Sequence, residues 1–174
     1  ESVLKTTMRN AQILKADPTN YDARAEIMWC GSLSHNDTTG ERSFGDWACH
    51  QIEHELSGIW DIAHGAGLAA IWGSWARYVY KYNLPRFVQL AVNVMGVPND
   101  FRNQEATALE GIARMEEFFR SIDMPTSIGE MGIELTEENI KELAYKCSFM
   151  NTRTVGKVKA LNIEDMENIY RAAK

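Results

Sequence analysis

Apolar residues recur at spacings of three and four along almost the whole chain, and no stretch alternates polar and apolar residues as a half-buried strand would. The first segment, SVLKTTMRNAQILKA, shows the pattern: Val3, Leu4, Met8 and Ala11 share one helical face. We therefore expect an all-α fold. The chain has 174 residues, 45% of them hydrophobic, which is enough for one core. Residues 1–174 are accordingly predicted to form a single helical domain.

Breaker and polar residues set the expected helix boundaries in the first half of the chain. Pro18 ends the first helix, because the residue before a proline is kept out of helical geometry. A second helix is predicted from about Asp22 to His35, followed by the polar loop NDTTGERSFGD. A third helix starts near Asp46, which could cap it, and is weakened by Gly58.

Five further helices are predicted in the rest of the chain. The fourth runs from about His64 to Tyr82, and the fifth has Pro85 in its first turn and Gly96 at its end. The remaining three helices begin behind polar residues that can accept hydrogen bonds from free backbone N–H groups. These N-cap candidates are Asn103, Thr136 and Asn162.

Charge and hydropathy exclude two classes of partner. Lys and Arg number 18 against 24 Asp and Glu, a formal charge of -6, and no dense basic run offers a footprint for nucleic acid. The most apolar segment, HGAGLAAIWGSWARYVYKY, is interrupted by Arg77 and Lys81 and falls short of the ~20 apolar residues that cross a membrane. We expect neither nucleic acid nor membrane as a partner.

The three cysteines point to a reducing compartment. Cys30, Cys49 and Cys147 are widely spaced and form no CxxC pair, so we interpret them as reduced thiols, most simply small buried hydrophobes. There is no signal-peptide pattern, and the first helical register is already running at Glu1. We expect a cytoplasmic protein and a chain cut from a longer one.

One short stretch, CHQIEHELSGIWDIAHG, holds three of the four histidines. His50 and His54 are four residues apart, so they share a helical face and can reach toward one ion. His64 follows a turn and returns a third imidazole. Three such groups favour a metal site, although a buried, hydrogen-bonded histidine beside surface histidines would explain the pattern more simply. Glu53 and Glu55 are interpreted either as outer partners of the ligands or as solvated charges.

Two other functions fit the same residues. HQIEH matches the H-x-x-E-H pattern of a zinc metalloprotease, with Glu53 as general base and His50 and His54 as ligands, but no distant acidic ligand stands out. A di-iron bundle would need Glu-x-x-His twice, and only Asp61-x-x-His64 occurs, so we set it aside. A stand-alone helical binding or scaffold module remains the other alternative.

A long resemblance favours a different activity. The segments NYDARAEIMWCGSLSHN, GDWACHQIEHELSGIWDIAHGAGLAAIWGSWARYVYK and FFRSIDMPTSIGEMGI resemble the carboxy-terminal helical domain of the iron-containing (group III) alcohol dehydrogenases, in particular the butanol dehydrogenase branch. That fold is also similar to dehydroquinate synthase. In this family one Asp and three His hold the metal. The resemblance implies that His50 and His64 are metal ligands and that His54 lies near the nicotinamide and the substrate, as a catalytic and cofactor-binding residue.

The resemblance also implies what the whole enzyme does. The expected activity is hydride transfer between NADH or NADPH and short-chain primary alcohols or aldehydes such as butanol, with Fe²⁺, alternatively Zn²⁺, in a homodimeric parent protein. The other Asp and His ligands would lie in an Asp-x-x-x-His motif before Glu1. No GxGxxG run occurs here, so the NAD(P)-binding α/β domain is expected outside this chain. With two ligands of four, residues 1–174 alone should be inactive and bind metal weakly.

Overall fold

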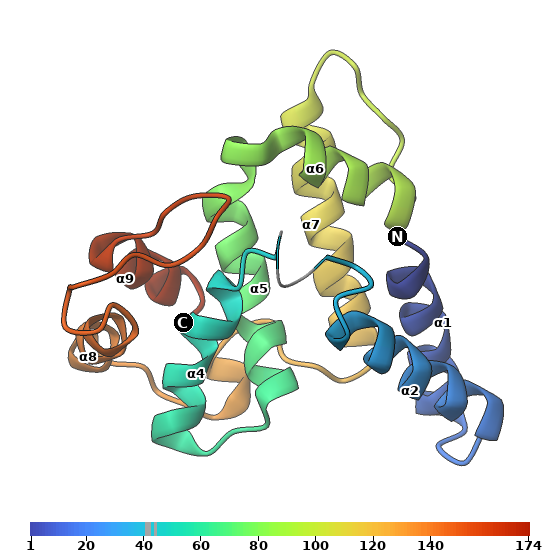
Figure 1. Cartoon of the computed structure of the whole chain (residues 1–174), viewed down its shortest axis with the longest axis horizontal. Helices are drawn as coiled ribbons and strands as arrows, with labels where there is room; N and C mark the ends of the chain where they lie inside the picture. Colours follow the sequence, from blue (N-terminus) through green and yellow to red (C-terminus); the bar gives the residue numbers. More distant parts are fainter. Residues whose placement is uncertain (41–42, 44) are drawn as a thin grey trace.

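The computed structural model describes residues 1–40, 43 and 45–174, and within these residues the predicted all-α fold is confirmed. Helices joined by turns and short 3₁₀ segments make up the chain (Figure 1), and the described part contains no strand beyond one isolated antiparallel bridge between Val155 and Leu161. The helices are α1 (Ser2–Ala16), α2 (Tyr21–His35), α4 (Ala48–Trp60), α5 (His64–Val79), α6 (Leu84–Gln89), α7 (Gln104–Ser121), α8 (Glu137–Cys147) and α9 (Ile163–Ala172).

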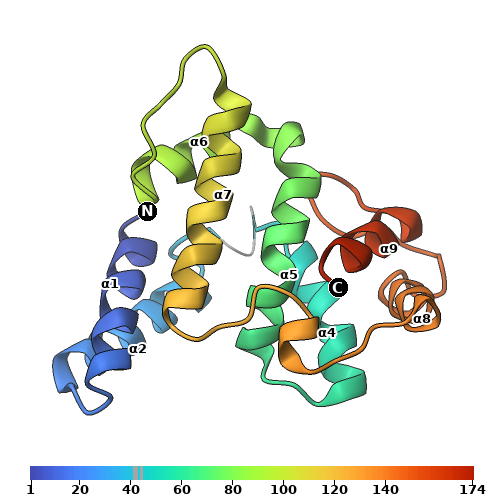
Figure 2. The same cartoon turned by 180° about the vertical axis from the view of Figure 1, so that it is seen from behind.

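Helices α4 and α5 pack together in the middle of the molecule, with α7 on one side and α8 and α9 on the other (Figures 1 and 2). The α1–α2 hairpin lies beyond α7. The core contains fully buried side chains from each central helix, among them Ile52 of α4, Ile71 of α5, Ile112 of α7, Leu143 of α8 and Ile169 of α9. The two helices that carry the histidines are therefore held by packing on both sides.

The predicted caps of the last three helices are confirmed. Asn103 accepts a hydrogen bond from a backbone N–H in the first turn of α7. Thr136 and Asn162 each form a capping box, with Asn139 and Asp165 as the reciprocal partners three residues later. These boundaries could be predicted because each depends on residues that are adjacent in sequence.

Other boundaries differ from the prediction. Helix α4 continues through Gly58 to Trp60, because burial of Ile52 and Leu56 on the same helix outweighs the ~1 kcal/mol by which this glycine weakens it. The fourth helix narrows to a 3₁₀ turn at Tyr80–Asn83. The fifth widens into a π-helical turn at Leu90–Val94 before it ends.

Asp46 does not occupy the N-cap position of α4, which belongs to Trp47 with a φ of 62°. Its carboxylate accepts instead from the backbone N–H groups of Ala48, at 3.0 Å, and of Lys157 and Val158, at 2.6 and 2.7 Å. Asp46 thus ties the start of α4 to the segment between α8 and α9. Residues 41, 42 and 44 of the predicted polar loop lie outside the described residues.

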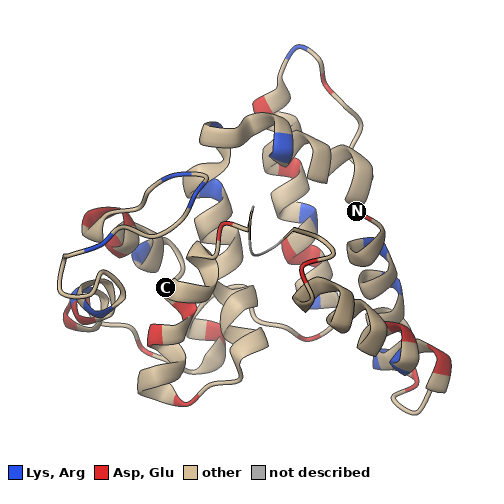
Figure 3. Ribbon diagram, in the orientation of Figure 1, with Lys and Arg blue, Asp and Glu red and all other residues tan. Residues whose placement is uncertain are grey.

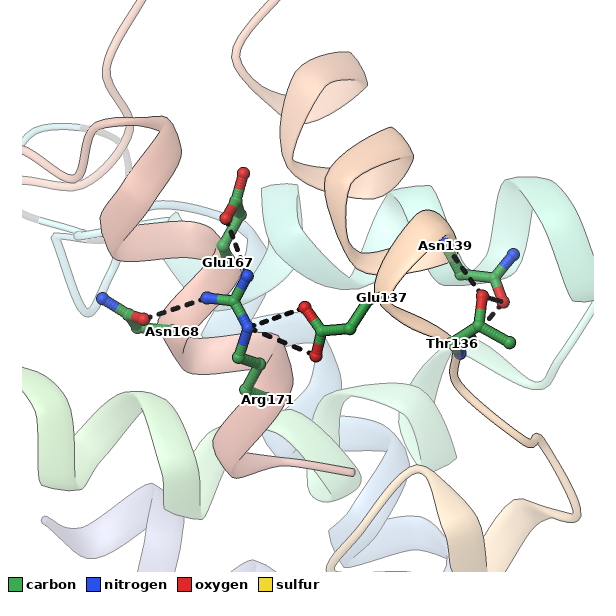
Figure 4. A network of polar contacts seen from close by, with 6 residues as sticks. All are labelled: Thr136, Glu137, Asn139, Glu167, Asn168 and Arg171. Carbon is green, nitrogen blue, oxygen red and sulfur yellow. Dashed lines mark hydrogen bonds and ion pairs between the residues drawn. The ribbon is translucent and has the colours of Figure 1, made fainter.

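Charged side chains join α8 to α9 on the surface. Arg171 of α9 donates to Glu137 at 3.0 Å, to Glu167 at 2.9 Å and to Asn168 at 3.1 Å (Figure 4). Because these groups are largely exposed, solvent screens their attraction and each pair contributes little to stability. The network orients α8 and α9 relative to each other, and the apolar core already stabilises their contact.

Asp165 joins α9 to α5 more firmly. One carboxylate oxygen accepts from the Tyr78 hydroxyl at 2.7 Å, and the other accepts from the backbone N–H of Asn162 at 2.9 Å and pairs with Lys159. Burial alone would raise the pKa of Asp165, but the hydrogen bonds from Lys159, Tyr78 and Asn162 outweigh it and lower the pKa below its ordinary value.

We expect Asp165→Asn to lower the free energy of unfolding by about 2 kcal/mol at pH 7. A carboxylate with a lowered folded-state pKa stabilises the protein above its unfolded pKa of ~3.9, and this contribution disappears as pH falls through the folded-state pKa. The gap between wild type and variant should therefore shrink below pH ~4 in urea unfolding series. The exposed Glu134→Gln is the matched control, expected within ~0.5 kcal/mol of wild type. A constant gap across that range would contradict the assignment.

Lys and Arg are dispersed over several helices and loops, without one basic face in the view of Figure 3. Within the described part of the chain, no helix combines the length and the apolar character that a membrane crossing requires.

Candidate metal centre

The three clustered histidines come from two helices that a tight turn places side by side. His50 and His54 lie one turn apart on α4, and His64 is the first residue of α5. Between them the chain reverses at Asp61, whose φ is 48°. Asp tolerates this left-handed conformation better than most residues. The turn therefore brings His64 back beside His54.

The structure brings these three imidazoles into one cluster. The ring centroids of His50 and His64 are 5.3 Å apart, those of His54 and His64 5.2 Å, and those of His50 and His54 6.3 Å. His50 is half-buried beside Trp47, and His54 is exposed. His35, the fourth histidine, bonds to its own helix through the Gly31 carbonyl.

Burial lowers the pKa of His50, and the neighbouring His64 and His54 lower it further. The imidazole of His50 is therefore held toward its neutral form at physiological pH. Neutral imidazole is the form that donates a lone pair to a metal. The lowered pKa of His50 is therefore what a metal ligand needs, and it differs from that of a charged histidine on the surface.

Glu53 is completely buried between α4 and α5, unlike a solvated charge. One of its carboxylate oxygens accepts from the Ser57 hydroxyl, and the other contacts Nδ1 of His64. Among the described residues, possible ligand atoms of Glu53, His54 and His64 lie within 4.8 Å of one another. Of the two interpretations of Glu53 from the sequence, the structure supports an outer partner of the histidines.

The environment of Glu53 argues against the protease interpretation. A general base must present a free carboxylate oxygen to the water that it activates. Both oxygens of Glu53 already have partners, and the side chain has no exposed surface. Glu53 is therefore placed to orient His64 and is poorly placed to activate a water molecule for peptide hydrolysis.

One residue in the sequence, Gly67, could have indicated that Glu53 is buried against α5. Gly67 lies in the first turns of α5, where a glycine costs helix stability. A Cβ at this position would lie 2.7 Å from Cγ and 2.9 Å from Cδ of Glu53. A glycine inside a helix beside a histidine cluster could have indicated that another side chain needs this space.

An apolar hollow of 460 Å³ opens beside His50. Its walls come from α5, α7 and the start of α4, and Gly65 lies at its edge close to His64. Aromatic side chains dominate these walls: Trp47, Trp72, Trp75, Phe118 and Phe119. The hollow can accept a hydrocarbon group within reach of the histidine cluster.

The cysteines take no part in the cluster. All three are free, Cys30 and Cys147 are buried as expected, and Cys49 is half-buried. Burial raises the pKa of Cys147 to about 12 and that of Cys49 well above its ordinary value. These thiols are held in the protonated form, which is a poor metal ligand.

The donor set fits a divalent transition metal. His50 offers a neutral imidazole, and His64 has Nδ1 against Glu53, which leaves Nε2 free to coordinate. Imidazole nitrogens suit both iron and zinc. Two imidazole donors alone do not complete a four-coordinate site.

Comparison with known proteins gives the family. A family model described as "Fe-containing alcohol dehydrogenase family, C-terminal" matches residues 1–174. The chain belongs to this family.

Individual relatives carry more specific names. The chain is 35% identical over 173 residues to a probable NADH-dependent butanol dehydrogenase 1 of Bacillus subtilis, covering 99% of this chain and 44% of that protein. It is 32% identical over 172 residues to NADH-dependent butanol dehydrogenase A of Clostridium acetobutylicum, covering 98% of this chain and 43% of that protein. The chain thus spans less than half the length of these relatives.

The fold agrees with a solved relative. The crystal structure of NADH-dependent butanol dehydrogenase A from Thermotoga maritima superimposes with a TM-score of 0.90 at 30% identity, covering 99% of this chain and 44% of that one. The expected carboxy-terminal helical fold of the family is therefore confirmed.

Proposed function

We propose that this chain is the metal-binding helical domain of an NAD(P)H-dependent alcohol dehydrogenase that interconverts short-chain primary alcohols, such as butanol, with their aldehydes. The observation that carries the proposal is the convergence of the His50, His54 and His64 rings into one cluster between α4 and α5. The family membership and the names of the butanol dehydrogenases that it resembles support the reaction class.

His50 and His64 would hold Fe²⁺, or Zn²⁺, as two of its ligands. When bound, such a cation acts as a Lewis acid that polarises the oxygen of the alcohol or aldehyde. His54 is exposed and its ring lies 5.2 Å from that of His64, so it can exchange a proton between the substrate oxygen and solvent. The apolar hollow beside His50 suits the hydrocarbon part of the substrate.

The rest of the enzyme is also part of the proposal. Because the chain spans 44% of its relatives' length, we place the NAD(P)-binding α/β domain and the remaining Asp and His ligands in the part of the parent protein outside residues 1–174. The free cysteines fit the reducing cytoplasm, and the family resemblance adds a homodimeric parent. The preference for NADH or NADPH would be set by residues of that other domain.

The decisive experiment is cofactor-linked reduction of butanal by the complete natural protein. The protein is stripped with a chelator, reloaded separately with Fe²⁺ and Zn²⁺, and assayed with NADH and with NADPH. We expect activity to disappear on stripping and to return with one metal. A protein that binds metal without oxidising either cofactor would contradict the proposal and favour a binding or scaffold module.

A further inference from the structure

We propose that Glu53 is a positioning residue that fixes the ring orientation and tautomer of His64, and that Gly67 maintains the space that Glu53 needs. This inference rests on the proposed function, because it concerns how His64 presents its nitrogen to a metal. It adds to that function a buried, three-residue support made of Glu53, Ser57 and Gly67.

An ionised Glu53 carboxylate can interact with His64 only as a hydrogen-bond acceptor. A buried carboxylate is costly unless its oxygens accept hydrogen bonds. Ser57, one turn later on α4, donates to one oxygen, and the other faces Nδ1 of His64. Because an ionised carboxylate only accepts, the ring proton of neutral His64 must lie on Nδ1. Nε2 is then left with its lone pair for coordination.

The location of His64 makes such a support necessary. His64 begins α5, and 46% of its side-chain surface is exposed, so packing alone does not hold the ring. The side chain of Glu53, in contrast, has no exposed surface and is enclosed by two helices. A rigid carboxylate therefore restrains a mobile ring, which lowers the entropy lost when a metal binds.

Gly67 is the independent observation that supports this role. It lies one turn after His64 on α5, directly against the Glu53 carboxylate. A methyl group there would press on Oε1 of Glu53 and lie 2.7 Å from its Cγ. The side chain of Glu53 is completely buried, which leaves it little room to move aside. Gly67→Ala should therefore disturb the Glu53–His64 contact without changing either residue.

Two readouts separate positioning from a purely structural role. Nitrogen-15 NMR of the histidine rings in the metal-free complete protein reports the tautomer of His64, and competition with a chromophoric chelator reports the dissociation constant for Zn²⁺. Circular dichroism and thermal melting show whether each variant is folded. None of these measurements depends on enzyme activity.

We expect Glu53→Ala to mix the two tautomers of His64 and to weaken Zn²⁺ binding by about 10- to 100-fold. Glu53→Gln should largely keep the tautomer, because the amide oxygen still accepts from Nδ1–H, and should lose less affinity than Glu53→Ala. Gly67→Ala should resemble Glu53→Ala. The controls are Glu55→Gln, a neighbouring half-buried carboxylate, and Gly58→Ala, whose added methyl meets no atom within 4 Å. Both controls should match wild type.

Unchanged tautomer and Zn²⁺ affinity in folded Glu53→Ala or Gly67→Ala would overturn the proposal. If Glu53→Ala does not fold, Gly67→Ala decides by the same criteria, because Glu53→Gln is expected to keep the tautomer. If the wild-type protein binds neither Fe²⁺ nor Zn²⁺, the proposed function fails separately. The NMR measurement then still decides whether Glu53 sets the tautomer of His64.

Discussion

Replacing either His50 or His64 with alanine in the complete protein is expected to abolish stoichiometric metal binding and to reduce cofactor-linked butanal reduction by about 10³-fold or more. The physical reason is that polarisation of the substrate oxygen by a metal contributes several kcal/mol, and each 1.36 kcal/mol corresponds to a factor of about ten in rate. Metal content after dialysis and initial rates at saturating cofactor provide the two measurements.

His54→Ala is the informative comparison for these two variants. If His54 transfers a proton and does not coordinate, its variant should keep the metal and lose about 10²- to 10⁴-fold in rate, with one limb of the pH profile removed. His35→Ala is the control, because His35 bonds to its own helix and lies outside the cluster. It should keep both metal and activity.

The geometry also defines the result that would change the ligand assignment. Potential ligand atoms of Glu53, His54 and His64 lie within 4.8 Å of one another, whereas His50 is outside this group. Loss of metal in His54→Ala together with its retention in His50→Ala would show that His54 coordinates and His50 does not. The proposed catalytic role of His54 would then be wrong.

Features that depend on local sequence could be predicted from it. The caps at Asn103, Thr136 and Asn162 need only a backbone N–H two or three residues away, and all three occur as expected. The approach of His50 to His54 likewise follows from helix geometry. That His64 joins them depends on the turn at Asp61, which the sequence indicated only through the recurrence of histidine.

Features that depend on packing between distant segments could not be predicted in the same way. Glu53 is next to Ile52 in sequence, yet helical periodicity does not show that its carboxylate lies inside the helix pair. Its burial requires the absence of a side chain at Gly67 on the other helix. The π turn at Leu90–Val94 is a similar case, because no residue in it is a helix breaker. Both follow from contacts made after the helices assemble.

Gly111 lies where α7 crosses that π turn, and we expect Gly111→Ala to lower the free energy of unfolding by about 2 kcal/mol. A Cβ at this position would be 2.7 Å from Cα and 3.3 Å from the backbone nitrogen of Ala91. Because the obstacle is mainly backbone, the helices must separate, and overpacking of this kind typically costs about 1–3 kcal/mol. The ~1 kcal/mol that alanine gains over glycine in a helix offsets part of this cost, so a cost at the upper end of the range leaves a net loss of about 2 kcal/mol.

Thermal melting measures this effect, with an expected decrease of about 4–8 °C for a protein of this size. Gly31→Ala is the matched control: Gly31 also lies inside a long helix, and an added methyl there meets no atom within 4 Å. This control should melt at or slightly above the wild-type temperature, since only the propensity gain acts. If Gly111→Ala melted at the same temperature as this control, α7 and the π turn would be less closely packed than they are in the structure. Opposite shifts in the two variants would instead establish that the closeness of this crossing, rather than helix propensity, requires glycine at position 111.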